Sequence, residues 1–211
     1  MLKFSECTLV KLDKTFSLNR TYKDKTLRDW IEGKSTISDI ERHVLNMYRQ
    51  ALDIQGYDWN EVELRQHFIG PMLALVNFSS PQIGIFSERR FSGIVDGIEM
   101  SGEPDSIISS GFREPEKPYF CFQEYKKERD PKGDPAGQAL AAMLVAQEIN
   151  EHRHPIYGCY VQGRDWSFMV LHDKEYCISR PYVAVHDDIV EIFRILKVLK
   201  QIIIRLVAID D

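Results

Sequence analysis

The chain has 211 residues, 44% of them hydrophobic, which is enough for one well-packed domain and too little for two. Its 32 acidic and 27 basic residues give a net charge of −5, which argues against a protein that coats nucleic acid through bulk electrostatics. No long apolar run predicts a membrane span, and the amino-terminal residues lack the apolar core of a secretory signal. The four cysteines form no C-x-x-C pair, so the sequence favours a cytoplasmic protein without a zinc site.

The first third of the chain predicts an extended segment followed by two helices. Residues 7–22 alternate enough for a short strand or extended arm. Apolar residues then repeat at three- and four-residue steps over residues 35–56, which predicts an amphipathic helix. A second helix is predicted from about 60 to 77, and Pro71 inside it is expected to kink or strain it.

The rest of the chain mixes strand and helix patterns, which predicts an α/β protein. Gly93 and Gly97 are expected to mark turns or bulges, and a later helix is rich in small residues that permit close packing on a sheet. The predicted elements are one or two strands over 83–100, strands over 105–110 and 118–126, a loop over 128–134, a helix over 135–152, a hairpin over 156–161 and 166–171, and a helix from 187.

Two of these predicted strands carry a distinctive set of charged residues. Pro104-Asp105 begins one strand, and Glu124-Tyr125-Lys126 ends the next. Residues two apart in a strand point to the same side, so Glu124 and Lys126 share a face. If the strands pair, Asp105, Glu124 and Lys126 converge. Two carboxylates are a minimal site for Mg²⁺ or Mn²⁺, and a neighbouring lysine can hold a water beside a phosphate.

The Pro104-Asp105 pair followed by Glu124-Tyr125-Lys126 resembles the signature of the PD-(D/E)XK nuclease superfamily. The segment over 60–73 is similar to the first core helix of that superfamily. The nearest likeness is to the N-terminal nuclease region of type I restriction enzymes, whose spacing is matched here by Glu61, Arg65, Ile69 and Pro71.

This resemblance implies a restriction-endonuclease-like α/β core in which a central mixed β-sheet is flanked by helices. The core would span residues 58–171 of a single domain, with an N-terminal helical extension over 1–57 and a helical segment over 172–211. It also implies metal-dependent phosphodiester hydrolysis of nucleic acid, with DNA as the expected substrate and Mg²⁺ or Mn²⁺ as the cofactor.

The resemblance also assigns roles to individual residues. Asp105 is the expected primary metal ligand and Glu124 the second, Lys126 would orient the attacking water, and Gln138 would bind a water or phosphate nearby. Glu61 is the favoured third acid and Glu63 its competitor. These two lie about 200° apart on a helix, so only one can face the site.

Several alternatives stay open. Asp96 and Glu103 are alternative acids near the motif, and His152 and His154 are interpreted as surface residues. The C-terminal helix is either a core helix or one that also pairs with a second subunit as a homodimer. The whole protein is alternatively a non-catalytic module that binds nucleic acid or protein, or an unrelated α/β protein with an accidental motif. The expected nucleic-acid contacts, each of them otherwise an ordinary solvated residue, are Arg89, Arg90, Lys127, Arg129 and Lys132.

Overall fold

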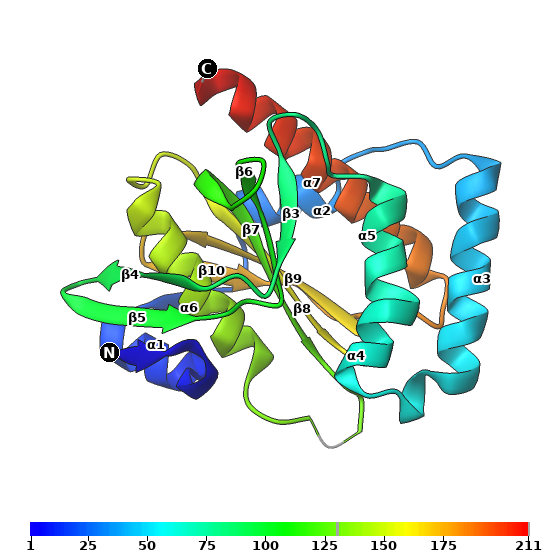
Figure 1. Cartoon of the computed structure of the whole chain (residues 1–211), viewed down its shortest axis with the longest axis horizontal. Coiled ribbons are helices and arrows are strands. Elements are labelled where there is room, and N and C mark those ends of the chain that lie inside the picture. The colour runs from blue at the N-terminus through cyan, green and yellow to red at the C-terminus, as the bar shows by residue number, and fades with distance from the viewer. Residues whose placement is uncertain (130, 211) are drawn as a thin grey trace.

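The computed structural model describes residues 1–129 and 131–210. Within these residues a central mixed sheet of eight strands is accompanied by a smaller sheet of three (Figure 1). The central sheet has the order β2 (Asn19–Thr21), β10 (Glu175–Ile178), β9 (Asp165–His172), β8 (Ile156–Gln162), β7 (Glu116–Lys126), β6 (Ser106–Ser110) and β3 (Gly84–Ser87), and β11 (Tyr182–Val183) pairs with β9. The smaller sheet has the order β1 (Leu2–Lys3), β5 (Ile98–Gly102) and β4 (Phe91–Val95).

Helices cover both faces of the central sheet, so the prediction of an α/β protein with a mixed sheet flanked by helices is confirmed. One face buries a core that includes Trp30, Phe68, Trp166 and Phe193. Its helices are α2 (Lys25–Ile31), α3 (Asp39–Gln55), α4 (Glu61–Leu64), α5 (Gly70–Val76) and α7 (Asp188–Asp210). The other face packs against α6 (Pro135–Ile149), α1 (Leu9–Phe16) and the smaller sheet.

The helix predicted over 60–77 is present but is interrupted by a π-helical turn, η3 (Arg65–Ile69). The N–H of Gly70 donates to the carbonyl of Arg65, five residues earlier, and Pro71 stands at the start of α5. Because proline has no N–H and its ring collides with the preceding turn, a wider turn accommodates it without breaking the helix. This turn is the local distortion that Pro71 predicts.

The prediction of a strand or extended arm over residues 7–22 is wrong for most of its length. Residues Leu9–Phe16 form α1, with Thr8 as N-cap and Ser17 in the left-handed conformation at the other end. Leu12 and Phe16 are four residues apart and lie on one buried face. Only Asn19–Thr21 is extended, as β2, which pairs in parallel with β10.

The N-terminal residues form more than a helical extension, because they supply a strand to each sheet. Leu2–Lys3 pairs with β5 and Asn19–Thr21 with β10. The prediction of one or two strands over 83–100 is too low, because three strands, β3, β4 and β5, begin there. Gly97 lies in a turn at φ 79°, as predicted. Gly93 instead lies within β4, where a Cβ would approach Val145 of α6 to 2.7 Å.

The C-terminal segment begins with two short strands that the sequence pattern did not predict, β10 and β11, before α7. Most apolar side chains of α7 are buried against the central sheet, so α7 is a core helix; Ile204 is exposed. Pairing of α7 with a second subunit stays a prediction. No helix in the described part of the chain is both long enough and apolar enough to cross a membrane.

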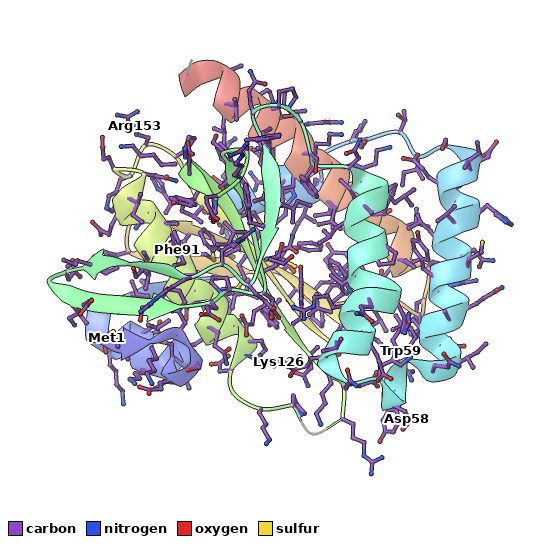
Figure 2. All side chains as sticks on the ribbon, viewed as in Figure 1. Met1, Asp58, Trp59, Phe91, Lys126 and Arg153 are labelled. Carbon is purple, nitrogen blue, oxygen red and sulfur yellow. The ribbon has the colours of Figure 1, made fainter. Side chains whose placement is uncertain are left out.

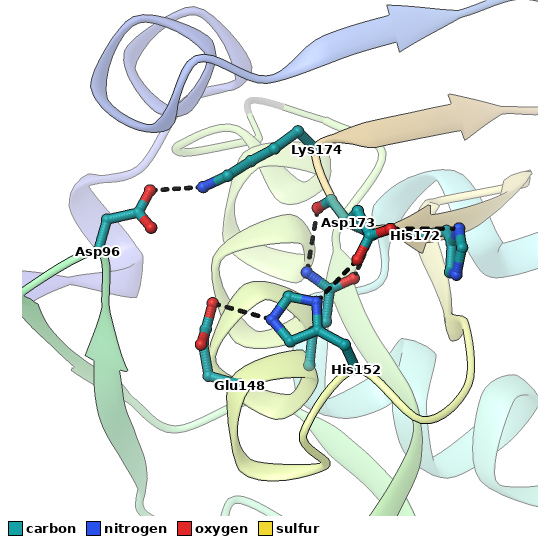
Figure 3. Close-up of polar contacts among 7 residues, drawn as sticks. Asp96, Glu148, His152, His172, Asp173 and Lys174 are labelled. Carbon is teal, nitrogen blue, oxygen red and sulfur yellow. Dashed lines mark hydrogen bonds and ion pairs between the residues drawn. The ribbon is translucent and has the colours of Figure 1, made fainter.

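The turn between β9 and β10 holds α6 and the β4–β5 hairpin in place (Figure 3). The buried side chain of Gln147 on α6 exchanges two hydrogen bonds with the backbone of Asp173. His152 contacts Glu148 and Asp173, while Lys174 forms an ion pair with Asp96 in the β4–β5 turn. These contacts fix the hairpin relative to α6.

The two histidines differ in their surroundings. His152 is partly exposed, as predicted. The prediction of a surface position for His154 is wrong, because His154 is only 7% exposed and stacks on Phe120.

Candidate metal centre

The register of the β6–β7 pair brings the two predicted metal ligands together. Ser106 lies opposite Gln123 and Ile107 opposite Phe122. Asp105, one residue before Ser106, therefore lies across from Glu124, one residue after Gln123. Asp105 Oδ2 accepts a hydrogen bond from the backbone N–H of Tyr125 at 2.6 Å, which locks the first carboxylate against the second strand.

Lys126 joins this carboxylate pair from the same face of β7. Its Nζ donates to Glu124 Oε1 at 2.8 Å, and Tyr125 between them is buried in the core on the opposite face. Lys126 stands at the end of β7, where the chain leaves the sheet towards α6 (Figure 2). The structure thus brings together Asp105, Glu124 and Lys126.

Burial and mutual repulsion set the ionisation of the two acids. The pKa of Glu124 is raised to about 7, chiefly by burial and then by the charge of Asp105, while Lys126 lowers it. Burial also raises the pKa of Asp105, although the hydrogen bond from the Tyr125 N–H and the charges of Lys126 and Arg65 lower it. Burial alone would lower the pKa of Lys126, but the ion pair with Glu124 outweighs it and the pKa is raised. A cation between the two acids would relieve this repulsion.

Arg65, on the π-helical turn, lies at the edge of this group. Its Nη1 bonds Glu88 Oε1 at 2.6 Å and lies 3.9 Å from Asp105 Oδ1. The sequence indicates Arg65 only through a spacing that resembles that of type I restriction enzymes. Here its guanidinium helps keep Asp105 ionised.

The two candidates for the third acid have different surroundings. Glu63 Oε2 accepts the backbone N–H of Asn60 at 2.8 Å, in a capping box at the start of α4. Glu61 is exposed, and its charge raises the pKa of both Asp105 and Glu124, so it lies on the side of the carboxylate pair. Glu63 is therefore engaged in capping, which leaves Glu61 as the acid that faces the site.

The described residues contain no group of three or more His, Cys, Asp or Glu side chains arranged to hold a metal ion. Glu61 is thus near the pair without completing a three-acid cluster. Mg²⁺ commonly binds through one or two carboxylates and keeps several of its waters. The donor set of Asp105 and Glu124 fits that requirement.

A cavity of about 400 Å³ opens beside Glu124. Gln138, in the first turn of α6, lines it, as do Arg90 and Glu103. Lys3 and Ser5 from the amino-terminal segment also line it. Sequence reasoning missed these two residues, because the parallel pairing of β1 with β5 joins segments almost a hundred residues apart.

The structure separates the basic residues that were predicted to bind nucleic acid. Arg90 lines the cavity, whereas Arg89 forms an ion pair with Glu114 at 3.5 Å. Three others lie on the connection from β7 to α6. Lys127 there is partly buried, Lys132 is exposed, and Arg129 lies 4.0 Å from Asp58.

The two alternative acids are likewise separated. Glu103 lines the cavity, but Asp96 in the β4–β5 turn is ion-paired with Lys174.

Neither the models of known protein families nor the curated proteins contain a match to this chain.

Proposed function

We propose that the protein is a Mg²⁺-dependent nuclease of the PD-(D/E)XK type that cleaves DNA. The observation that carries the proposal is the convergence of Asp105, Glu124 and Lys126 at the paired ends of β6 and β7. Asp105 lies just before β6 and Glu124 lies in β7; the two carboxylates repel each other, and the lysine is already hydrogen-bonded to Glu124. A cavity large enough for part of a substrate adjoins Glu124.

The succession of elements supports a restriction-endonuclease-like core. From α5 the chain continues through β3, β6 and β7, then α6 and β8. β3, β6 and β7 pair antiparallel in turn, and β8 returns parallel to β7 after the crossover helix. This is the α-β-β-β-α-β order that the resemblance implies, with the β4–β5 hairpin inserted after the first strand.

Asp105 and Glu124 would hold the cation, with Glu61 close enough to add to the negative field. A cation bound there lowers the pKa of a coordinated water and neutralises charge on the scissile phosphate. Lys126 would position the attacking water and stabilise the phosphate through its ammonium group. Gln138, at the cavity wall, would donate its amide N–H to a phosphate oxygen or water.

The test is cleavage of linear, supercoiled, single-stranded and branched DNA in Mg²⁺, in Mn²⁺ and in chelator. Wild type would be compared with Glu124→Ala and Lys126→Ala, and with Lys23→Ala as the control, because Lys23 is exposed and lies outside the cavity lining. We expect metal-dependent cutting that the first two substitutions abolish and the control retains. No cutting of any substrate, together with no Mn²⁺ binding by calorimetry, would favour the non-catalytic binding module instead.

A further inference from the structure

The amino-terminal segment supplies a fixed wall of the cavity beside Glu124, through Met1, Lys3, Phe4 and Ser5. Leu2 and Lys3 pair in parallel with Met100 and Ser101 of β5, the strand that leads to Asp105. Phe4 is buried and packs on Gly102, where a Cβ would lie 2.5 Å from the Phe4 ring. This close approach holds the amino-terminal strand beside the chain that enters the metal centre.

The same segment is also bound to the start of α6. Asp134, the N-cap of α6, accepts the N–H of Gly137 at 3.0 Å through one oxygen and the N–H of Leu9 at 2.9 Å through the other. A Cβ on Gly137 would lie 2.6 Å from Thr8 Cα, so the two backbones touch. Residues 2–9 are thus held from both sides, by β5 and by the helix that carries Gln138.

This wall places opposite charges around the cavity. Lys3 and Arg90 supply two cations to the lining, from β1 and from the residue before β4, and both residues are exposed. Glu103 and Glu124 are the acids of the same lining. The cations suit phosphate oxygens on either side of a scissile bond, and Glu103 would disfavour a phosphate placed near it.

We infer that the cavity wall formed by residues 3–5, together with Arg90, binds the sugar–phosphate backbone of an unpaired nucleic acid strand and leads it to Glu124. The cavity volume of about 400 Å³ falls in the range of sites that enclose a single small ligand, about 300 to 1,000 Å³. One strand can enter such a space with its phosphates against Lys3 and Arg90, whereas a duplex carries its phosphates on the outside of a far wider body. The inference rests on the proposed function for its choice of ligand.

The test measures binding without cleavage. Fluorescence anisotropy of a short labelled single-stranded DNA, and of the duplex of the same sequence, would be recorded in chelator over a range of salt concentrations. The variant Lys3→Gln/Arg90→Gln would be compared with Lys23→Gln/Arg42→Gln, which removes the same charge from exposed positions outside the cavity lining. Glu103→Gln would be measured beside them.

We expect the wild type to bind the single strand more tightly than the duplex. The Lys3/Arg90 variant should lose at least about tenfold in affinity, and its salt slope should fall by about 1.4 for two lost phosphate contacts. The matched control should bind as the wild type does, and Glu103→Gln should bind more tightly.

Equal or tighter binding of the duplex, an unchanged Lys3/Arg90 variant, or no binding of the strand at all would each overturn the inference. Because cleavage is not required, the two proposals fail separately. A protein that loses strand binding in the Lys3/Arg90 variant but never cuts DNA would keep this inference and lose the nuclease. If the wild type cuts DNA but the Lys3/Arg90 variant binds the strand as tightly as the wild type does, the nuclease is kept and this inference is lost.

Discussion

Lys126 Nζ donates to Glu124 Oε1 at 2.8 Å although the two side chains are only 12% and 10% exposed. An ion pair this deeply buried lies beside a second carboxylate, that of Asp105. Lys126 therefore compensates the charge of two acids while paired with one. A divalent cation would take over that compensation and release the ammonium group for a water or phosphate.

Replacing Lys126 by methionine tests its role in the reaction. Methionine keeps the apolar stem but removes the charge, so we expect DNA cleavage to fall by about 10²-fold or more. Mn²⁺ binding measured by calorimetry at pH 8 should persist, because both carboxylates remain. Lys23→Met, at an exposed position outside the cavity lining, is the control, and full cleavage by Lys126→Met would contradict the assignment.

Glu61 and Glu63 can be separated by the same conservative substitution. Glu61→Gln should weaken Mn²⁺ binding, because it removes a negative charge that acts on both Asp105 and Glu124. Glu63→Gln should leave binding unchanged, since glutamine also completes a capping box with Asn60. Calorimetric titration of the two variants distinguishes them. Weaker binding in Glu63→Gln alone would reverse the choice.

The pKa of Glu124 gives metal binding a pH dependence. Its value of about 7 lies above the ordinary 4.5, so the carboxyl is protonated in mildly acidic solution and cannot bind a cation. Mn²⁺ affinity should rise from pH 6 to pH 8 and binding should release protons, which calorimetry in buffers of different ionisation enthalpy detects. Affinity that does not change over this interval would contradict the raised pKa.

The same pKa affects stability in chelator. Between about pH 4.5 and pH 7 the native state binds more protons at Glu124 than the unfolded state does, so the stability contributed by this group is present below 4.5 and lost as pH rises through 7. Glu124→Gln lacks this titration. We expect the melting temperature of the wild type to fall relative to that of Glu124→Gln between pH 5 and pH 8. A difference that stays constant over this interval would contradict the raised pKa of Glu124.

Gly137 lets α6 pack directly on the backbone of the amino-terminal segment, and this packing contributes to stability. Alanine there would gain about 1 kcal/mol of helix propensity, but its Cβ would lie 2.6 Å from Thr8 Cα and 2.7 Å from the Cys7 carbonyl oxygen. Because both neighbours are backbone, we expect a net loss of about 1 to 3 kcal/mol in the free energy of unfolding, measured in urea. Gly97→Asn, in an open left-handed turn, should be nearly neutral. A more stable Gly137→Ala variant would show that the backbone at Cys7 and Thr8 shifts to make room for the Cβ and would contradict this prediction.

Long periodic segments were predictable from the sequence, while short and non-local elements were not. The stripe over 35–56 identifies α3 because its period is repeated over several turns. In α1 the polar and apolar residues alternate over a few positions, which is the pattern of a strand. Only the burial of Leu12 and Phe16, four residues apart, identifies the helix. β10 and β11 are too short to show a period.

The convergence of Asp105, Glu124 and Lys126 could be predicted from the sequence, but the residues that enclose the cavity beside them could not. Glu124 and Lys126 share a face because strand geometry requires it, and the pairing of Asp105 with Glu124 follows once β6 and β7 have the observed register. Lys3 reaches the cavity only through the parallel pairing of β1 with β5, which no local pattern encodes. Asp134 can be predicted as the N-cap of α6, but its hydrogen bond from the Leu9 N–H depends on the packing of α1 on α6.

The most direct test of the carboxylate pair is a Mn²⁺ titration at pH 8 followed by electron paramagnetic resonance, for wild type and for Asp105→Asn. The free-ion signal should be lost as the wild type binds Mn²⁺, Mg²⁺ should compete for the same site, and Asp105→Asn should bind at least about tenfold more weakly. Wild-type protein that leaves the free-ion signal unchanged, or Asp105→Asn that binds as the wild type does, would contradict a metal centre at Asp105 and Glu124.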